Sequence, residues 1–221
     1  MLQRILETEA MDTALEAEEY DAMDHAEVND RFVRDFAEAG GKPEVTLDLG
    51  TGTALIPLVL CEHWPNVRVV AADYAGEMLR IARQNIIRRK ADDRIVLVRV
   101  DGKRLPFADD SFPQVISNSI VHHVAEPEFI FREAWRVLRP GGIVFFRDLF
   151  RPPDAATLHE LVERYAGSAT PHQKKMFADS LQAALTVEEV REIIASLGLS
   201  TDGVRATSDR HWTWAARKPE A

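Results

Sequence analysis

Only one cysteine, Cys61, occurs among the 221 residues. A single thiol cannot close an internal disulfide or build a thiolate zinc site, which fits a reducing compartment. No uninterrupted run of about 20 apolar residues is present, so we expect no membrane-spanning helix. Residues 1–24 are rich in Glu and Asp and lack the basic-then-apolar order of a secretory signal. These absences predict a cytoplasmic protein that does not associate with membranes.

Basic charge is also scarce. The chain has 27 Lys and Arg against 36 Asp and Glu, which gives a formal net charge of −9. Each phosphate neutralised in a nucleic acid needs a Lys or Arg, so the acidic excess opposes diffuse binding to a phosphate backbone. The basic run 80–90 falls on an expected amphipathic helix and is interpreted as a solvated face. We therefore expect no nucleic-acid partner.

Short apolar runs alternate with amphipathic helices five times along the chain. This alternation predicts parallel strands joined by right-handed crossovers in a doubly wound sheet. Two later runs are too close together for a helical crossover, so one antiparallel strand is expected near the C-terminus. The predicted fold class is α/β: a Rossmann-like, doubly wound, mostly parallel seven-stranded sheet with helices on both faces. The expected strands are 45–49, 67–72, 95–100, 115–118, 143–147, 199–204 and 211–216.

The turn after the first expected strand is rich in glycine. Ligands of open α/β sheets bind beyond the carboxyl ends of the strands, so this turn is the expected ligand site. A dinucleotide fingerprint, G-x-G-x-x-G counted from Gly50 and Gly52, would put Leu55 at its third glycine, where the side chain obstructs close approach. Asp48 precedes the turn and could pair, directly or through water, with a ligand ammonium group. A cationic ligand is therefore favoured over NAD.

In this turn the sequence resembles the class I S-adenosylmethionine-dependent methyltransferases, whose first motif runs acidic-x-Gly-x-Gly-x-Gly after a strand. Asp48, Gly50 and Gly52 match the motif, and Ala54 stands at its third glycine. Residues 105–112 resemble the family's Leu-Pro-Phe and Asp-x-Ser-Phe stretch, although Pro113 replaces the Asp that usually follows. The resemblance covers roughly residues 45–147. It implies S-adenosylmethionine as the cofactor and methyl transfer to a small molecule as the activity.

The ends of the next strands supply further candidate cofactor contacts. Asp73 is placed to accept both ribose hydroxyls, and it can also cap the helix that follows. Tyr74 either lies on the adenine face or packs as an ordinary aromatic. The resemblance places an acidic residue, here Asp101, at the adenine amino group. The expected cofactor-binding residues are Asp48, Gly50, Gly52, Asp73, Tyr74, Asp101, Gly102 and Asn118.

Two histidines, His122 and His123, follow the fourth expected strand. Either could act as a general base, and the sequence does not distinguish them; the alternative is that they fill the core. The fifth strand ends at Arg147 and Asp148. Arg147 either pairs with Asp148 or holds a substrate carboxylate or phosphate. We expect Asp148 to join Arg147 in substrate binding, and we expect no metal site.

The last expected strand begins near Arg210 and His211. If this strand is antiparallel, its start lies at the ligand edge, so both residues are candidate substrate contacts. Trp212 and Trp214 share one face of the strand and are interpreted as core. The predicted partner is therefore a small molecule with an anionic group.

The whole chain, residues 1–221, is expected to form a single methyltransferase domain. Residues 1–42 would form an N-terminal helical lid, including Tyr20 and Asn29, and residues 43–150 the cofactor-binding core. Residues 151–185 would form a helical substrate cover, and residues 186–221 a C-terminal helix and strand pair. The helix is expected to begin at a Thr186–Glu189 capping box and to end at Gly198.

The predicted activity is in-line methyl transfer from S-adenosylmethionine to a small molecule, driven by positioning and with a histidine as the candidate base. One alternative is a non-catalytic regulatory module that binds the same cofactor. The other alternative is a nicotinamide-dependent oxidoreductase. Measured affinities for S-adenosylhomocysteine and for NAD would distinguish the oxidoreductase from the methyltransferase and the regulatory module.

Overall fold

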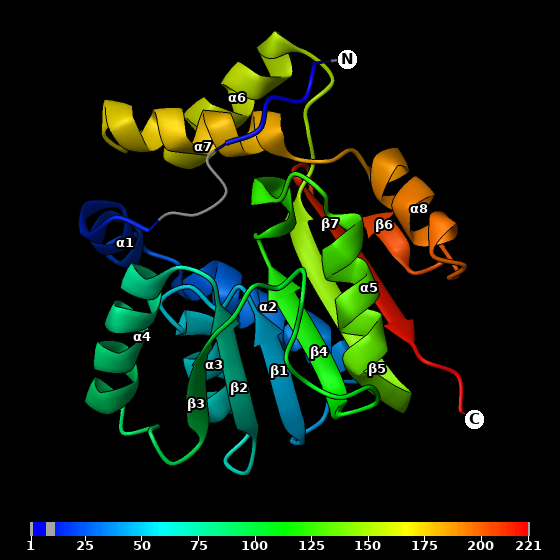
Figure 1. The fold of residues 1–221 in the computed structure, drawn as a ribbon. Coiled ribbons are helices and arrows are strands. Elements are labelled where there is room, and N and C mark those ends of the chain that lie inside the picture. Colours follow the sequence, from blue (N-terminus) through cyan, green and yellow to red (C-terminus); the bar gives the residue numbers. More distant parts are fainter. Residues whose placement is uncertain (1, 8–11, 221) are drawn as a thin grey trace. The chain divides into compact units, whose positions relative to one another are not determined.

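The computed structural model describes residues 2–7 and 12–220. Their strands form one seven-stranded sheet with the order β3-β2-β1-β4-β5-β7-β6 (Figure 1). β1 pairs in parallel with β2 and β4, and β2 pairs in parallel with β3. The strands are β1 (Val45–Leu49), β2 (Arg68–Asp73), β3 (Ile95–Arg99), β4 (Phe112–Asn118), β5 (Leu138–Leu149), β6 (Val204–Ala206) and β7 (His211–Arg217).

β7 is the antiparallel strand of the sheet. It pairs antiparallel with β6 on one side, and β5 is its other neighbour. Just past the end of β5, the Phe150 N–H donates to the Arg210 carbonyl immediately before β7 (2.8 Å). Near the start of β5, the Gly141 N–H donates to the Lys218 carbonyl just after β7 (2.8 Å). Opposite ends of the two strands therefore meet, and the predicted fold class is confirmed.

β5 is much longer than the expected strand 143–147. It includes Arg139–Gly142, although a Pro-Gly-Gly sequence is a signal that usually ends a helix and not one that begins a strand. The backbone of this segment pairs beyond the end of β7, because the Lys218 N–H donates to the Gly142 carbonyl (3.0 Å). Pairing with a distant strand thus overrides the local turn signal, which a single sequence does not show.

Two other strands also differ from expectation. β4 begins at Phe112 instead of residue 115, so Pro113 lies inside it near the start. The expected strand 199–204 is wrong in extent, since β6 covers only Val204–Ala206. Part of the missing stretch forms a turn, in which the Asp202 N–H donates to the Ser200 hydroxyl (3.2 Å).

The last helix begins and ends as the sequence predicted. The Thr186 hydroxyl accepts the Glu189 N–H (3.1 Å) and the Glu189 carboxylate accepts the Thr186 N–H (2.8 Å), which completes the capping box. Gly198 adopts a left-handed φ of +75° after the helix. The helices are α1 (Ala14–Asp21), α2 (Ala26–Glu38), α3 (Leu55–His63), α4 (Gly76–Arg88), α5 (Glu128–Val137), α6 (Ala155–Ala166), α7 (Pro171–Ala183) and α8 (Val187–Ser196), with a 3-10 turn η1 (Val121–His123).

Contacts divide the described chain into two compact units, and each is described by itself. We call residues 12–118, 129–146 and 215–220 the glycine-loop unit. Its core joins α2 to the sheet: Phe32 and Phe36 pack on Phe145 with ring centroids 5.2 and 5.6 Å apart. This packing orders α2, part of the segment predicted to be a lid, against the sheet.

The histidine unit comprises residues 2–7, 119–128 and 147–214. Its helices α6 and α7 lie side by side (Figure 1) and share a small core. Trp212 and Trp214 are fully buried, which confirms their prediction as core residues. No helix among the described residues is both long and apolar enough to cross a bilayer.

Candidate functional site

The glycine loop of residues 48–54 has a left-handed backbone at three alternate positions. The φ angles are 72° at Gly50, 55° at Gly52 and 63° at Ala54. Glycine adopts this conformation freely, whereas Ala54 carries a cost of about 1–2 kcal/mol. The N–H groups of Gly50 and Thr51 donate to the Ala72 carbonyl (2.8 and 3.0 Å), which fixes the loop to the end of β2.

Asp48 lies on β1 beneath this loop and is 1% exposed. Its Oδ2 atom has no hydrogen-bond partner within the described part of the chain. Burial, and to a smaller extent the charge of Asp73, raises the pKa of Asp48 to about 7, against the opposing effect of the Thr51 hydroxyl. A buried carboxyl group with an unpaired oxygen and a pKa near 7 is suited to a cationic ligand, because the ligand's charge would stabilise the ionised form.

Asp73 ends β2 and uses both of its carboxyl oxygens. Oδ2 accepts the Gly52 N–H (2.7 Å), and Oδ1 accepts the N–H of Ala75, the residue that precedes α4 (2.9 Å). Burial raises the pKa of Asp73, and these backbone hydrogen bonds oppose the rise. Asp73 therefore orders the turn before α4 but does not cap the helix as the sequence allowed, because the N-cap residue is Ala75 and no side chain caps it. Each oxygen keeps a second lone pair for a ligand hydroxyl.

A small hollow, open to solvent, lies against the glycine loop. Tyr20 of α1 is placed over the loop, since a Cβ added at Gly52 would meet the Tyr20 ring at 3.8 Å. Burial, together with the charges of Asp73 and Asp48, raises the pKa of Tyr20 to about 12, so its hydroxyl stays a neutral donor. The lining residues are Tyr20, Asn29, Gly50, Thr51, Thr53, Leu55, Ile56 and Asn118.

Six of the eight predicted cofactor residues are not part of this lining: Asp48, Gly52, Asp73, Tyr74, Asp101 and Gly102. Tyr74 is 56% exposed. Asp101 follows β3, and its Oδ1 accepts the Lys103 N–H (2.9 Å). The preceding Val100 N–H donates to the Asp73 carbonyl (2.9 Å), which keeps Asp101 beside the end of β2. A Cβ added at Gly102 would meet the end of the Ile130 side chain at 2.9 Å, so a side chain there would require Ile130 to shift.

The sequence predicted Tyr20 and Asn29 to lie in a lid, and it did not indicate Thr51, Thr53, Leu55 or Ile56 as site residues. The last four adjoin the glycine turn, so their position along the chain was a usable signal. The position of Tyr20 over the loop depends on tertiary structure and could not be predicted from the sequence. In that structure the Asn85 amide donates to the Asp21 carboxylate (2.7 Å) and to the Thr53 carbonyl (3.2 Å). These two bonds tie α1 and the loop to α4.

The histidine unit contains a buried aspartate with every oxygen engaged. Asp148 Oδ1 lies 2.6 Å from His122 Nδ1 and accepts the Leu149 N–H (2.6 Å). Its Oδ2 accepts the N–H groups of Val121 (2.6 Å) and His122 (3.3 Å). Burial alone would raise the pKa of Asp148, but the His122 charge and these hydrogen bonds outweigh it and lower the pKa. Asp148 therefore positions His122 and the η1 backbone.

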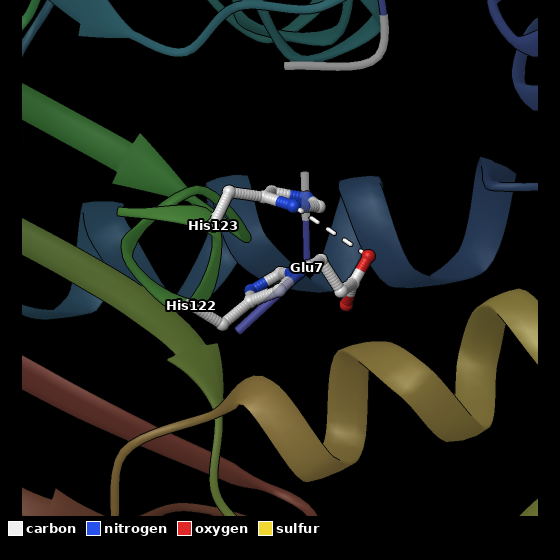
Figure 2. Close-up of side chains that lie close together, drawn as sticks. All are labelled: Glu7, His122 and His123. Atoms are coloured by element: carbon white, nitrogen blue, oxygen red, sulfur yellow. Dashed lines mark ion pairs between the residues drawn. The ribbon is translucent and has the colours of Figure 1, made fainter. Parts of the chain in front are cut away.

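The two histidines, which the sequence left equivalent, differ in the structure. Burial would lower the pKa of His122, but the charge and hydrogen bond of Asp148 outweigh it and raise the pKa. Burial and the neighbouring His122 lower the pKa of His123 to about 3. The two ring centroids are 4.0 Å apart, and His123 Nδ1 lies 3.7 Å from Glu7 Oε2 (Figure 2).

The predicted substrate arginines both make contacts within this unit. Arg147 is 9% exposed, and its Nε donates to the Thr213 hydroxyl (3.1 Å). The guanidinium of Arg210 lies 3.4 Å from the centre of the Tyr165 ring.

His211 Nδ1 lies 2.9 Å from the Ser208 hydroxyl. Burial, followed by the positive charges of Arg210 and Arg147, lowers the pKa of His211 to about 4. Its ring is therefore neutral near pH 7, and the carboxylates of Asp148 and Asp209 partly offset the two guanidinium charges beside it.

Comparison with known proteins agrees with this geometry. Residues 47–146 match a family model described as "Methyltransferase domain". A malonyl-[acyl-carrier protein] O-methyltransferase of Xylella fastidiosa is 32% identical over 148 residues, which cover 66% of this chain and 48% of the relative. A demethylmenaquinone methyltransferase of Thermus thermophilus is 39% identical over 117 residues, covering 52% of this chain and 51% of the relative. The chain thus spans about half the length of these curated relatives.

Solved structures share the fold. A putative S-adenosyl-L-methionine-dependent methyltransferase of Methanococcus maripaludis aligns with a TM-score of 0.72 and 17% identity, over 98% of each chain. Residues 47–146 of the present chain are a methyltransferase domain of the class I S-adenosylmethionine-dependent type. The resemblance found in the glycine turn is therefore confirmed, and S-adenosylmethionine is the cofactor of this class.

Proposed function

We propose that this chain transfers a methyl group from S-adenosylmethionine to a small molecule. The observation that carries the proposal is the unpaired Oδ2 of Asp48, buried beneath the glycine loop that borders the hollow. S-adenosylmethionine carries two cationic groups, an ammonium and a sulfonium. A nicotinamide dinucleotide has no such pair of cations, and its pyrophosphate is anionic. A buried carboxylate without a partner is thus better matched to the first ligand.

The residues of the glycine-loop unit fit such a ligand. Asp48 would ionise and hold the positive end of the methionyl part, and the loop backbone would lie against it. Asp73 would accept the ribose hydroxyls on the lone pairs that Gly52 and Ala75 leave free. Asp101, with Gly102 and Tyr74, remains the predicted contact for adenine. When bound, the cofactor supplies an electrophilic methyl group, and the chain's part is to orient it and exclude water.

The substrate remains a small molecule with an anionic group in this proposal. Arg147 and Arg210 supply guanidinium groups whose charge and planar geometry suit a carboxylate or phosphate, and His211 adds a neutral ring beside them. Asp148 is better assigned to positioning His122, since its oxygens are engaged. The relatives named above act on different acceptors, so their names do not select one for this chain. A base role for His122 or His123 stays a prediction.

The first test is calorimetric titration of the full chain with S-adenosylhomocysteine and, separately, with NAD. Binding of S-adenosylhomocysteine with no affinity for NAD is the expected result; the reverse would overturn the proposal. The second test is transfer of a labelled methyl group from the cofactor to small molecules of a metabolite extract. Binding without any transfer would favour the regulatory-module alternative. The cytoplasmic location and the absence of a nucleic-acid partner stay predictions.

A further inference from the structure

Three side chains of the histidine unit converge on one point. Glu7, His122 and His123 each direct one potential metal-ligand atom into a cluster in which these atoms lie within 4.8 Å of one another (Figure 2). Glu7 comes from the N-terminal segment, whereas the histidines come from η1. The sequence predicted no metal site here, because the two contributions are more than a hundred residues apart.

Two atoms of the cluster lack the partners that buried polar atoms normally have. Glu7 Oε1 and His123 Nδ1 are buried and make no hydrogen bond within the described residues. The side chains of both residues are 17% exposed. An orphaned buried polar atom is costly, so a purely structural cluster would be expected to pair these atoms. A bound cation would satisfy both of them at once.

Asp148 gives His122 the arrangement typical of a metal-ligating histidine. Its Oδ1 lies 2.6 Å from His122 Nδ1, which leaves Nε2 as the nitrogen available to a ligand. Carboxylates that hold the far nitrogen of a histidine fix the ring's orientation and raise its basicity as a ligand. The side chain of Asp148 is 1% exposed, so this support is rigid.

The N-terminal segment is anchored where Glu7 can reach the histidines. The guanidinium of Arg4 donates to the carbonyls of Ala183 (2.7 Å) and Val124 (3.0 Å). The Ile5 N–H donates to the Gln182 carbonyl (3.3 Å). These bonds connect residues 2–7 to the end of α7 and to the chain after η1, so the position of Glu7 is determined by several independent contacts.

We propose that Glu7, His122 and His123 bind one divalent transition-metal ion of the Zn²⁺ type. Two imidazole nitrogens and one carboxylate oxygen suit Zn²⁺ and its first-row neighbours better than Ca²⁺ or Mg²⁺, which prefer oxygen ligands. Ligand atoms around a tetrahedral Zn²⁺ are about 3.4 Å apart, so binding requires the cluster to contract, with the flexible Glu7 side chain moving most. Three protein ligands leave the fourth position open.

This site and a general-base role for the same histidines exclude each other, because the lone pair that would accept a substrate proton is given to the metal. The open fourth position instead suits a carboxylate or phosphate oxygen of a small molecule. The proposal concerns metal binding alone. It does not depend on the methyltransferase activity proposed above.

The test uses the full chain without a histidine tag, stripped with a chelator and desalted. We expect the protein to bind one equivalent of Zn²⁺, measured by calorimetry and by metal analysis after gel filtration, and to raise its Tm by several degrees on binding. Co²⁺ should give visible d–d absorption of a four- or five-coordinate site. The single variants Glu7→Gln and His123→Gln should each weaken Zn²⁺ binding at least tenfold.

A matched control separates this site from surface histidines. His63 also lies close to a carboxylate, with Nε2 2.9 Å from Asp30 Oδ1, but it belongs to the glycine-loop unit. His63→Gln should leave the Zn²⁺ affinity unchanged. Unchanged affinity in Glu7→Gln or His123→Gln, or less than a tenth of an equivalent bound by folded wild-type protein, would overturn the proposal. Affinity of each variant for S-adenosylhomocysteine reports separately on the proposed function.

Discussion

Two buried aspartates at strand ends, one in each unit, have opposite electrostatic situations. Asp48 and Asp148 are each 1% exposed. Asp148 receives backbone N–H groups and the His122 ring, and its pKa is lowered. Asp48 has an oxygen without a partner, and its pKa is raised to about 7. Equal burial therefore accompanies opposite pKa shifts, because the donors around each carboxyl group decide the direction of the shift.

The difference separates a structural carboxylate from one suited to a ligand. Hydrogen-bond donors of the chain itself engage both oxygens of Asp148, so removing its charge should destabilise the folded unit. One oxygen of Asp48 has no hydrogen-bond partner among the described residues, so removing the charge of Asp48 should stabilise the folded protein and weaken binding of the cofactor. The following predictions test this contrast, beginning with the largest effect.

Asp148→Asn should lower the free energy of unfolding by about 3–5 kcal/mol, because it removes one partner of a buried charged pair and turns an amide toward backbone donors. Urea unfolding at neutral pH measures the effect. The exposed Asp93, whose side chain is 79% exposed, supplies the control variant Asp93→Asn, which should change stability by less than about 0.5 kcal/mol. If Asp148→Asn lowers the free energy of unfolding by less than about 1 kcal/mol, the assignment of Asp148 as a structural carboxylate is wrong.

Asp73→Ala should weaken S-adenosylhomocysteine binding by about 1.5–3 kcal/mol, the range of charge-assisted hydrogen bonds. Calorimetry measures the change. Asp73→Asn keeps an oxygen that can accept the Ala75 N–H, so it separates loss of the turn before α4 from loss of the charge. If Asp73→Ala folds normally and binds as tightly as the wild type, Asp73 serves only the turn.

Asp48→Asn should raise the free energy of unfolding of the ligand-free protein by about 2 kcal/mol at pH 8, after allowing for an unpaired amide. In the folded state the pKa of Asp48 is about 7, above the ordinary value of about 3.9 expected in the unfolded chain. The folded state therefore binds more protons between these values, and wild-type stability falls as the pH rises from about 4 to 7.

Stability measured from pH 4 to pH 8 tests this sign, since the advantage of Asp48→Asn should shrink as the pH falls. The same variant should bind S-adenosylhomocysteine less tightly than the wild type. A variant less stable than the wild type at pH 8 would show that Asp48 is satisfied within the fold, like Asp148.

Ala54→Gly should leave stability within about 0.5 kcal/mol of the wild type. Relief of the left-handed φ of 63° is worth about 1–2 kcal/mol, and loss of a buried methyl group and of chain restriction opposes it by a similar amount. The control Ala82→Gly removes an equally buried methyl from the interior of α4 without relieving strain, and should cost about 2 kcal/mol. Equal losses in both variants, measured by urea unfolding, would contradict the strain at Ala54.

The sheet and the glycine turn were predictable because their signals are local. Apolar runs and the Asp48–Ala54 pattern lie within a few residues, and they indicated the alternation of strands and helices and the position of the loop correctly. The extension of β5 over Arg139–Gly142 was not predictable, because it depends on pairing near Lys218. Distant pairing partners do not appear in a local pattern.

The candidate site divides in the same way. Gly50 and Asn118 line the hollow as their strand-end positions suggested. Tyr20 over the loop and Glu7 beside the histidines depend on the packing of the N-terminal segments, which no spacing rule indicates. The unequal protonation of His122 and His123 follows from Asp148, a residue whose sequence position suggested substrate binding instead.

The titration of Asp48 near neutrality makes ligand capture an exchange reaction. A monocation that enters beside the protonated carboxyl group would displace its proton, so the interior of the glycine-loop unit would gain no net charge. Buffers of differing ionisation enthalpy would reveal that released proton in the heat of association. Loading near neutral pH would then depend on pH, because the ligand cation and a proton compete for the same carboxylate.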